Sequence, residues 1–227
     1  MSVDVGANEG GYTWHMRRFS RGVHAFEPLP ELALRLSAGF ALDRRVHVHQ
    51  VALSDRLGTA ELRVPGSQDG LDWGLGTIEV ANSLSGQEVR RFRVPMRTLD
   101  SYKLRNVGFI KIDVEGHELA VLRGSTALIK ACHPAFLIEA QEMHQPGSLA
   151  RVTAFLSEAG YRGLFLCEGA LHDISEFDLA THQAEDALDA TLNRRPGRCF
   201  VYNFLFVTDT LPFRHRAAGL IPTAVNH

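Results

Sequence analysis

The chain has 227 residues, of which 45% are hydrophobic and 22% are charged, and this composition suits one globular domain with a substantial core. Its formal net charge of -2 excludes binding to nucleic acid through bulk positive charge. The sequence contains no apolar run of about 18 residues and no leader-like start, so we expect a cytoplasmic protein without a membrane segment. The expected partner is a small molecule.

Three cysteines, Cys132, Cys167 and Cys199, are widely spaced and form no CxxC pair. An odd number without metal-ligand spacing is typical of free thiols in a reducing compartment. We therefore expect neither a disulfide framework nor a cysteine-rich metal site.

The chain opens with an apolar strand at residues 3–5 that runs into a glycine-rich turn. Glycines at the end of a first strand let the backbone approach a ligand, and the helix that follows offers free N–H donors. The spacing Gly6-x-x-x-Gly10-Gly11 lacks the middle glycine of dinucleotide-binding turns, and Asp4 would repel phosphate groups. This favours S-adenosylmethionine, which carries a sulfonium and an ammonium group and no phosphate. A turn without any ligand is the alternative.

Apolar periodicity predicts alternating strands and helices after this turn. Helices are expected at residues 12–19, 30–40, from near 116 to about 130, and 148–159, and strands at residues 22–28, 46–53, 107–114, 134–139, 161–167 and 199–208. A strand pair at 59–64 and 88–94 flanks a Gly/Ser-rich stretch at 65–86, which is a candidate insertion or lid. We expect one domain over residues 1–210 with an inserted hairpin or loop at about 58–95, an irregular polar segment at 168–198, and a loosely held tail at 211–227.

Four acidic residues, Asp4, Glu27, Asp113 and Glu139, lie within or at the carboxyl ends of apolar strands. Parallel strands bring such ends to one rim of a sheet, where open α/β folds bind ligands. Glu27 follows Gly6 by 21 residues, close to the spacing at which an acid reaches ribose hydroxyl groups. The alternative for Glu27 is a solvated carboxylate before a proline turn.

Five segments resemble, in order and spacing, the FkbM-family methyltransferases: VDVGANEG (3–10), FEP (26–28), VALSD (51–55), RTLD (97–100) and FIKIDVEGHE (109–118). The resemblance covers roughly residues 2–140. It implies a Rossmann-like class I methyltransferase fold, which is a three-layer α/β sandwich with a mainly parallel seven-stranded sheet and an antiparallel last strand. It also implies S-adenosylmethionine as cofactor and O-methylation of a hydroxyl group on a small metabolite, sugar or glycan.

The resemblance also assigns cofactor contacts. The turn would hold the methionine portion, Glu27 the ribose, and the segment after the third strand would lie beside adenine, with Asp113 near the methyl group. The cofactor-binding residues implied are Asp4, Gly6, Ala7, Asn8, Gly10, Glu27, Ser54, Asp55 and Asp113. Class I folds usually have a helix before the first strand, and here the chain starts inside that strand. We therefore expect the insertion or a partner subunit, such as a second copy in a homo-oligomer, to complete the pocket.

Methyl transfer to a hydroxyl group needs alignment of the acceptor and removal of one proton. His117 is the first candidate for the base because imidazole titrates near neutral pH, and Asp113 would orient it or grip the acceptor. A helix-start histidine without a catalytic role is the alternative. Asp113, His117 and Glu139 would also suit a divalent cation, although metal-free catalysis is favoured.

Other residues carry weaker signals. His47 and His49 alternate on one strand and indicate sheet packing more than a metal pair. His144 is a second candidate base, and Trp73 is a candidate for stacking on an acceptor. A nicotinamide-dependent oxidoreductase and a noncatalytic S-adenosylmethionine-binding module remain as alternative functions.

Overall fold

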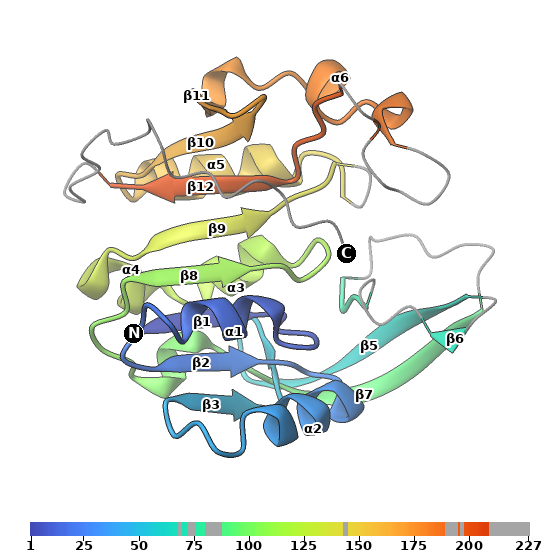
Figure 1. Cartoon of the computed structure of the whole chain (residues 1–227), viewed down its shortest axis with the longest axis vertical. Coiled ribbons are helices and arrows are strands. Elements are labelled where there is room, and N and C mark those ends of the chain that lie inside the picture. The colour runs from blue at the N-terminus through green and yellow to red at the C-terminus, as the bar shows by residue number, and fades with distance from the viewer. Residues whose placement is uncertain are drawn as a thin grey trace.

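The computed structural model describes residues 1–67, 70–71, 76–79, 88–142, 145–188, 195 and 198–208. Its main feature is an eight-stranded sheet with the strand order β11-β10-β12-β9-β8-β1-β2-β3 (Figure 1). The strands are β1 (Ser2–Val5), β2 (Val23–Phe26), β3 (Val46–His49), β8 (Phe109–Ile112), β9 (Ala135–Glu139), β10 (Arg162–Cys167), β11 (Ala170–Asp173) and β12 (Asn203–Val207). The five strands from β9 to β3 are parallel, so their carboxyl ends meet at one rim.

The predicted seven strands with an antiparallel last strand are confirmed, because β12 is antiparallel to both β9 and β10. An eighth strand, β11, was not predicted. It forms a hairpin with β10 through Glu168 and Gly169, which have φ of 49° and 80°. Two successive residues with positive φ suit a tight hairpin. The segment after β10 is therefore more ordered than expected, and it also contains η3 (Ile174–Glu176), α6 (Leu179–His182) and η4 (Glu185–Ala187).

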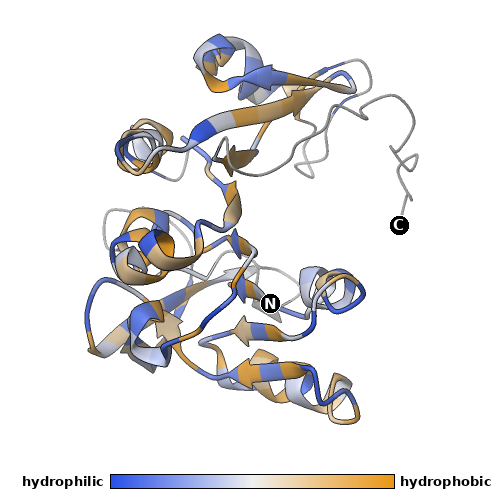
Figure 2. Ribbon diagram, turned by 90° about the vertical axis from the view of Figure 1, so that its left-hand side faces the viewer, coloured by the Kyte–Doolittle hydropathy of each residue, from blue (hydrophilic) through white to orange (hydrophobic). Residues whose placement is uncertain are grey.

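Helices cover both faces of this sheet and complete three layers (Figures 1 and 2). Helices α1 (Gly11–Met16) and α2 (Pro30–Gly39) lie on one face, and α3 (Glu118–Arg123), α4 (Thr126–Cys132) and α5 (Ser148–Glu158) lie on the other. The single helix predicted up to residue 130 is broken between α3 and α4. Gly124 lies at the break, where a Cβ atom would lie 2.0 Å from the carbonyl oxygen of Ser54, so the chain packs closely there.

The predicted insertion forms a second, smaller sheet with the order β4-β7-β5-β6. Its long pair, β5 (Gly58–Ser67) and β7 (Val89–Arg97), is antiparallel as predicted, and β4 (Ala52–Leu53) and β6 (Gly70–Leu71) flank it. The strand predicted over 46–53 is therefore divided, because the chain leaves the main sheet after His49 and joins β7 from Ala52 onward. The second sheet packs on α2 through an apolar cluster that includes Leu32, Leu62 and Val94. It projects from the rim where the parallel strands end (Figure 1).

The cysteine prediction was wrong for two of the three residues. Cys167 at the end of β10 and Cys199 before β12 form a disulfide with a Cα–Cα distance of 5.9 Å, while Cys132 is a free thiol. The pairing of β10 with β12 brings the two together across 32 residues of sequence, which spacing alone does not reveal. Trp73, His144 and the tail at 211–227 lie outside the described residues. In the described part of the chain, no helix has the length and apolar character needed to cross a bilayer.

Candidate active site

The glycine turn after β1 lies against the end of β8. Gly6 has a φ of 74°, and a Cβ atom there would lie 1.8 Å from the carbonyl oxygen of Asp113, so only glycine fits. The N–H groups of Gly6 and Ala7 both donate to the carbonyl oxygen of Phe26 at 3.0 Å, which fastens the turn to the end of β2. Gly10, the residue before α1, caps this helix with a φ of 90°. The turn is therefore held between the ends of β2 and β8, the two strands that flank β1.

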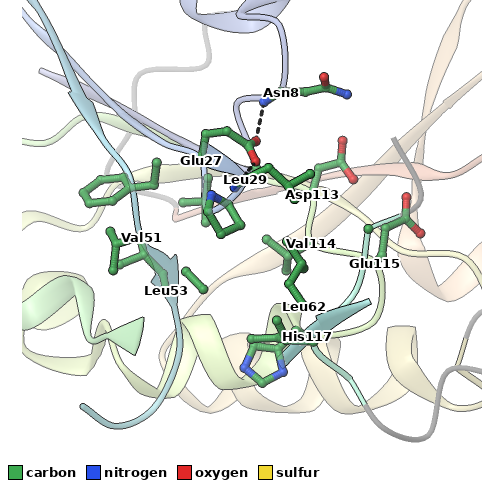
Figure 3. A pocket seen from close by; sticks show the side chains of 17 residues that line it. Asn8, Glu27, Leu29, Val51, Leu53, Leu62, Asp113, Val114, Glu115 and His117 are labelled. Carbon is green, nitrogen blue, oxygen red and sulfur yellow. Dashed lines mark hydrogen bonds between the residues drawn. The ribbon is translucent and has the colours of Figure 1, made fainter. Parts of the chain in front are cut away.

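A pocket of about 630 Å³, which includes its open mouth, lies in front of this turn (Figure 3). Asn8, Glu27, Asp113 and Glu115 present polar groups along one side, and His117 lies apart from Asn8 and Glu27, beside Leu62. The other side is apolar, and its lining includes Val51, Leu53, Leu62 and Ile78. The last two come from the insertion, which thus forms one wall. A polar rim and an apolar wall together suit a nucleoside with a charged extension.

Glu27 is held rigidly at the end of β2, with its side chain toward the pocket. Its two carboxylate oxygens accept hydrogen bonds from the backbone N–H groups of Asn8 at 2.8 Å and Leu29 at 2.9 Å (Figure 3). Burial raises the pKa of Glu27, and the two hydrogen bonds, which favour the ionised carboxylate, offset only part of this effect. These two hydrogen bonds fix the direction of the Glu27 carboxylate at the pocket.

Asp4 lies beneath the turn and is not part of the pocket wall. Its side chain is fully buried, accepts a hydrogen bond from the Thr13 hydroxyl at 2.6 Å, and lies 3.8 Å from the Lys111 ammonium group. Burial raises the pKa of Asp4. The Asp4 side chain therefore supports the turn from inside.

Lys111 is a buried cation that sequence reasoning missed. Its Nζ atom donates to the carbonyl oxygen of Gly6 and to the carboxylate of Asp113, both at 3.0 Å. Burial alone would lower its pKa, but the attraction of Asp113 and Asp4 outweighs burial and raises it. The only sequence signal was a lysine inside the apolar run of β8. Lys111 links the glycine turn to Asp113.

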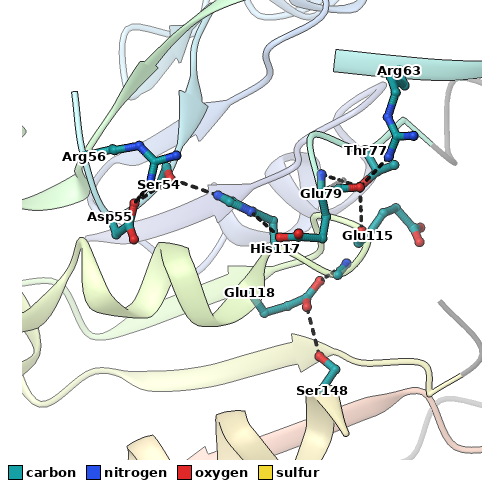
Figure 4. A network of polar contacts seen from close by, with 11 residues as sticks. Ser54, Asp55, Arg56, Arg63, Thr77, Glu79, Glu115, His117, Glu118 and Ser148 are labelled. Atoms are coloured by element: carbon teal, nitrogen blue, oxygen red, sulfur yellow. Dashed lines mark hydrogen bonds and ion pairs between the residues drawn. The ribbon is translucent and has the colours of Figure 1, made fainter. Parts of the chain in front are cut away.

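His117 is engaged at both ring nitrogens (Figure 4). Its Nε2 atom lies 2.9 Å from the hydroxyl oxygen of Ser54, and its Nδ1 atom lies 3.1 Å from a carboxylate oxygen of Glu79. Ser54 is buried behind the pocket, and Asp55 is turned toward Arg56 at 3.3 Å. Glu79 was also missed, because it lies in the insertion 38 residues before His117.

A short strap, residues 76–79, fastens the insertion over the pocket. The Thr77 hydroxyl donates to the carbonyl oxygen of Glu115 at 2.8 Å, and the backbones of Thr77 and Arg63 exchange two hydrogen bonds of 2.9 Å (Figure 4). The strap therefore joins β5 to the loop after β8, at the place where Glu79 meets His117.

Three acids gather beside the pocket. Asp113, Glu115 and Glu139 bring one carboxylate oxygen each to within 4.8 Å of one another, so these groups, rather than the predicted set with His117, are placed to hold a divalent cation. They line an adjoining cavity of about 210 Å³ together with Glu118. Burial, followed by repulsion from Asp113, raises the pKa of Glu139 to about 7, and burial raises that of Glu118 to about 7.

The sheet order, the glycine turn against β8 and the acid at the end of β2 define a class I methyltransferase fold. A family model described as the methyltransferase FkbM domain matches residues 4–162. The chain therefore belongs to the FkbM methyltransferase family, as its motifs predicted. No curated protein matches the chain significantly.

The chain is similar to several solved structures. The FkbM methyltransferase of Methylobacillus flagellatus KT is similar with a TM-score of 0.56 and 16% identity over 90% of this chain. This chain spans only 42% of the length of that protein. Precorrin-6y C5,15-methyltransferase of Geobacter metallireducens GS-15 has a TM-score of 0.46 at 12% identity, covering 91% of this chain and 79% of its own. A SAM-dependent O-methyltransferase of Thermotoga maritima has a TM-score of 0.43 at 10% identity, covering 91% and 58%.

Proposed function

We propose that the chain is an S-adenosylmethionine-dependent methyltransferase that methylates a hydroxyl group on a small metabolite, sugar or glycan. One observation carries the proposal: the Gly6 turn is packed against the Asp113 carbonyl, and the rigid Glu27 carboxylate lies beside it in one pocket. The glycines of the turn would let the methionine portion of the cofactor approach the chain closely, with no Cβ atom in the way. Glu27 would accept hydrogen bonds from the ribose.

The rest of the pocket fits the remaining parts of this cofactor. Val51, Leu53 and Leu62 would contact the adenine ring on the apolar side. The cofactor would supply an electrophilic methyl group on a sulfonium. The residues of the chain would then align the acceptor, exclude water and accept one proton.

Two groups compete for the role of the base. His117 is the base predicted from the sequence, and in the structure Ser54 and Glu79 engage both of its nitrogens. Glu139 lies at the end of the neighbouring strand β9, with a carboxylate oxygen within 4.8 Å of Asp113, and its pKa is raised to about 7. We favour Glu139 because a base poised near neutral pH transfers protons efficiently, and we keep Asp113 as the residue that grips the acceptor.

Cofactor binding tests the proposal first. Isothermal titration should show binding of S-adenosylmethionine and S-adenosylhomocysteine and no binding of NAD or NADH. Replacement Glu27→Ala should weaken binding of both sulfur ligands because it removes the ribose acceptor. Binding of NAD without any response to the sulfur ligands would instead support an oxidoreductase.

Acceptor identification tests the transfer itself. The protein is incubated with a metabolite or glycan extract and with S-adenosylmethionine that carries a deuterated methyl group, and mass spectrometry searches for a labelled product. A labelled oxygen-linked methyl group is expected. Binding of the cofactor without any labelled product across broad extracts would support a noncatalytic binding module.

The setting of the reaction is part of the same proposal. We propose that the chain acts in the cytoplasm on a small acceptor, without a nucleic-acid or membrane partner. Cell fractionation checks the compartment, and light scattering checks whether a second copy joins the chain.

A further inference from the structure

Three histidines gather on one face at the edge of the main sheet, and none of them lines the cofactor pocket. His24 lies on β2, and His47 and His49 lie on the edge strand β3. The register pairs His24 with His47, and residues two apart on a strand point to the same side, so the three rings share a face. The Nδ1 atom of His24 lies 3.0 Å from the Nε2 atom of His49.

Aromatic rings hold this pair in place. The His49 ring stacks on Phe26 with ring centres 4.6 Å apart, and the edge of Tyr102 meets it at 4.9 Å. The ring of His47 stacks on His24 at 4.9 Å. His24 and His49 are partly buried, whereas His47 is exposed. The two central rings are therefore pre-oriented, and solvent still reaches the cluster from the edge of the sheet.

Burial, together with the neighbouring imidazoles, keeps the central pair neutral. Burial and then His49 and His47 lower the pKa of His24 to about 4, with a further contribution from the chain N-terminus, and burial lowers the pKa of His49. A neutral imidazole has a lone pair available for a metal, whereas a protonated one has none.

We propose that His24 and His49 form a transition-metal site for Zn²⁺, Ni²⁺ or Cu²⁺, with His47 as a third ligand. With Zn–N bonds of about 2.0–2.1 Å, two nitrogens of a tetrahedral site lie about 3.3 Å apart. The observed 3.0 Å separation therefore needs an opening of only a few tenths of an ångström together with rotation of the rings toward the metal. The ring that donates the shared proton would carry that proton on its other nitrogen instead, so that both facing nitrogens present a lone pair. His47 joins by turning its exposed ring away from His24.

The metal would link β2 to β3 at the edge of the main sheet. Among the described strands of the main sheet, β3 pairs only with β2, and β2 leads directly to Glu27 at the cofactor pocket. A ligand that binds only the folded chain stabilises it, so metal bridging β2 and β3 raises the melting temperature. Imidazole ligands select Zn²⁺, Cu²⁺ and Ni²⁺ over Mg²⁺ and Ca²⁺.

Titration of the full chain with ZnCl₂ at pH 7.5 tests the site. One zinc per chain bound at the histidines is expected, with a rise in melting temperature. His24→Ala and His49→Ala each weaken binding by roughly tenfold or more because each removes one ligand, and His47→Ala weakens it less. His15→Ala, which changes an exposed histidine on α1, leaves binding unchanged. Glu139→Gln also leaves it unchanged, because the acidic group beside the pocket is a separate place for a cation.

A second measurement needs no substitution. In the unsubstituted chain, side-chain ¹⁵N resonances of His24 and His49 should shift on addition of Zn²⁺, so the test does not depend on the folding of the variants. The proposal is overturned if the chain binds no zinc, if the resonances of His24 and His49 do not shift, or if Glu139→Gln abolishes the binding. These outcomes are independent of whether the chain transfers methyl groups.

Discussion

At the scale of single residues, Gly6 is the position that tolerates substitution least. Its φ of 74° and the 1.8 Å approach to the Asp113 carbonyl exclude any side chain without movement of the backbone. Gly6→Ala should cost roughly 2 kcal/mol or more in the free energy of unfolding and abolish binding of S-adenosylhomocysteine. Urea denaturation and isothermal titration measure the two effects.

Gly11, five residues after Gly6, provides a matched control. A Cβ atom there meets nothing within 4 Å, and the residue opens α1. Gly11→Ala should therefore be neutral or stabilise the chain by about 0.4–1 kcal/mol, with cofactor binding retained. Equal effects of the two substitutions would show that packing against Asp113 is not what requires glycine at position 6.

The identity of the base is also decided at single residues. With the acceptor found by mass spectrometry, Glu139→Gln should lower turnover by roughly 10²–10⁴-fold, and the rise of kcat with pH through about 7 should disappear. The rise is expected because a base works only when deprotonated. His117→Ala should mainly weaken cofactor binding, since it removes the link between Ser54 and Glu79. Loss of the pH dependence in His117→Ala alone would return the role of base to His117.

At the scale of elements, the strap at residues 76–79 joins two parts of the chain that are distant in sequence. Thr77 is fully buried, and its hydroxyl both donates to Glu115 and accepts from the N–H of Glu79. Thr77→Val keeps the shape of the side chain and removes both hydrogen bonds. The strap should therefore lose roughly 1–3 kcal/mol of stability. We expect weaker binding of S-adenosylhomocysteine, measured by isothermal titration.

The matched control for the strap is Thr59→Val, at an exposed position on β5. This change should leave cofactor affinity as it is. If both variants bind the cofactor equally well, the strap does not contribute to closing the pocket.

The helices and strands also show which features of the structure can be predicted from the sequence. Strong apolar runs located seven strands of the main sheet but not β11, and the acids at the ends of β2, β8 and β9 were placed at one rim because parallel strands share their direction. The contact of Glu79 with His117 depends on how the insertion folds back across 38 residues, and no periodicity encodes that. The role of Lys111 could not be predicted, because a lysine within an apolar run only breaks the strand pattern until its carboxylate partners are known.

At the scale of the whole molecule, pH should change stability through buried acids. Burial raises the pKa of Glu118 from 4.5 to about 7 in the folded chain. Between these values the unfolded chain has lost the proton and the folded chain keeps it, so stability falls as pH rises. The contribution of Glu118 is full below pH 4.5 and is lost above about pH 7, a change of about 3 kcal/mol.

Glu118→Gln isolates this contribution, because the amide does not titrate and still accepts from the Gly116 N–H. The difference in unfolding free energy between variant and parent should move in favour of the variant by about 3 kcal/mol from pH 4.5 to pH 8, as measured by urea denaturation. Glu9→Gln, at an exposed position, is the control and should give a difference that does not vary. A Glu118→Gln difference that is constant across this range would mean that Glu118 is ionised in the folded chain, in which case its buried negative charge must be balanced by the backbone donors at the start of α3.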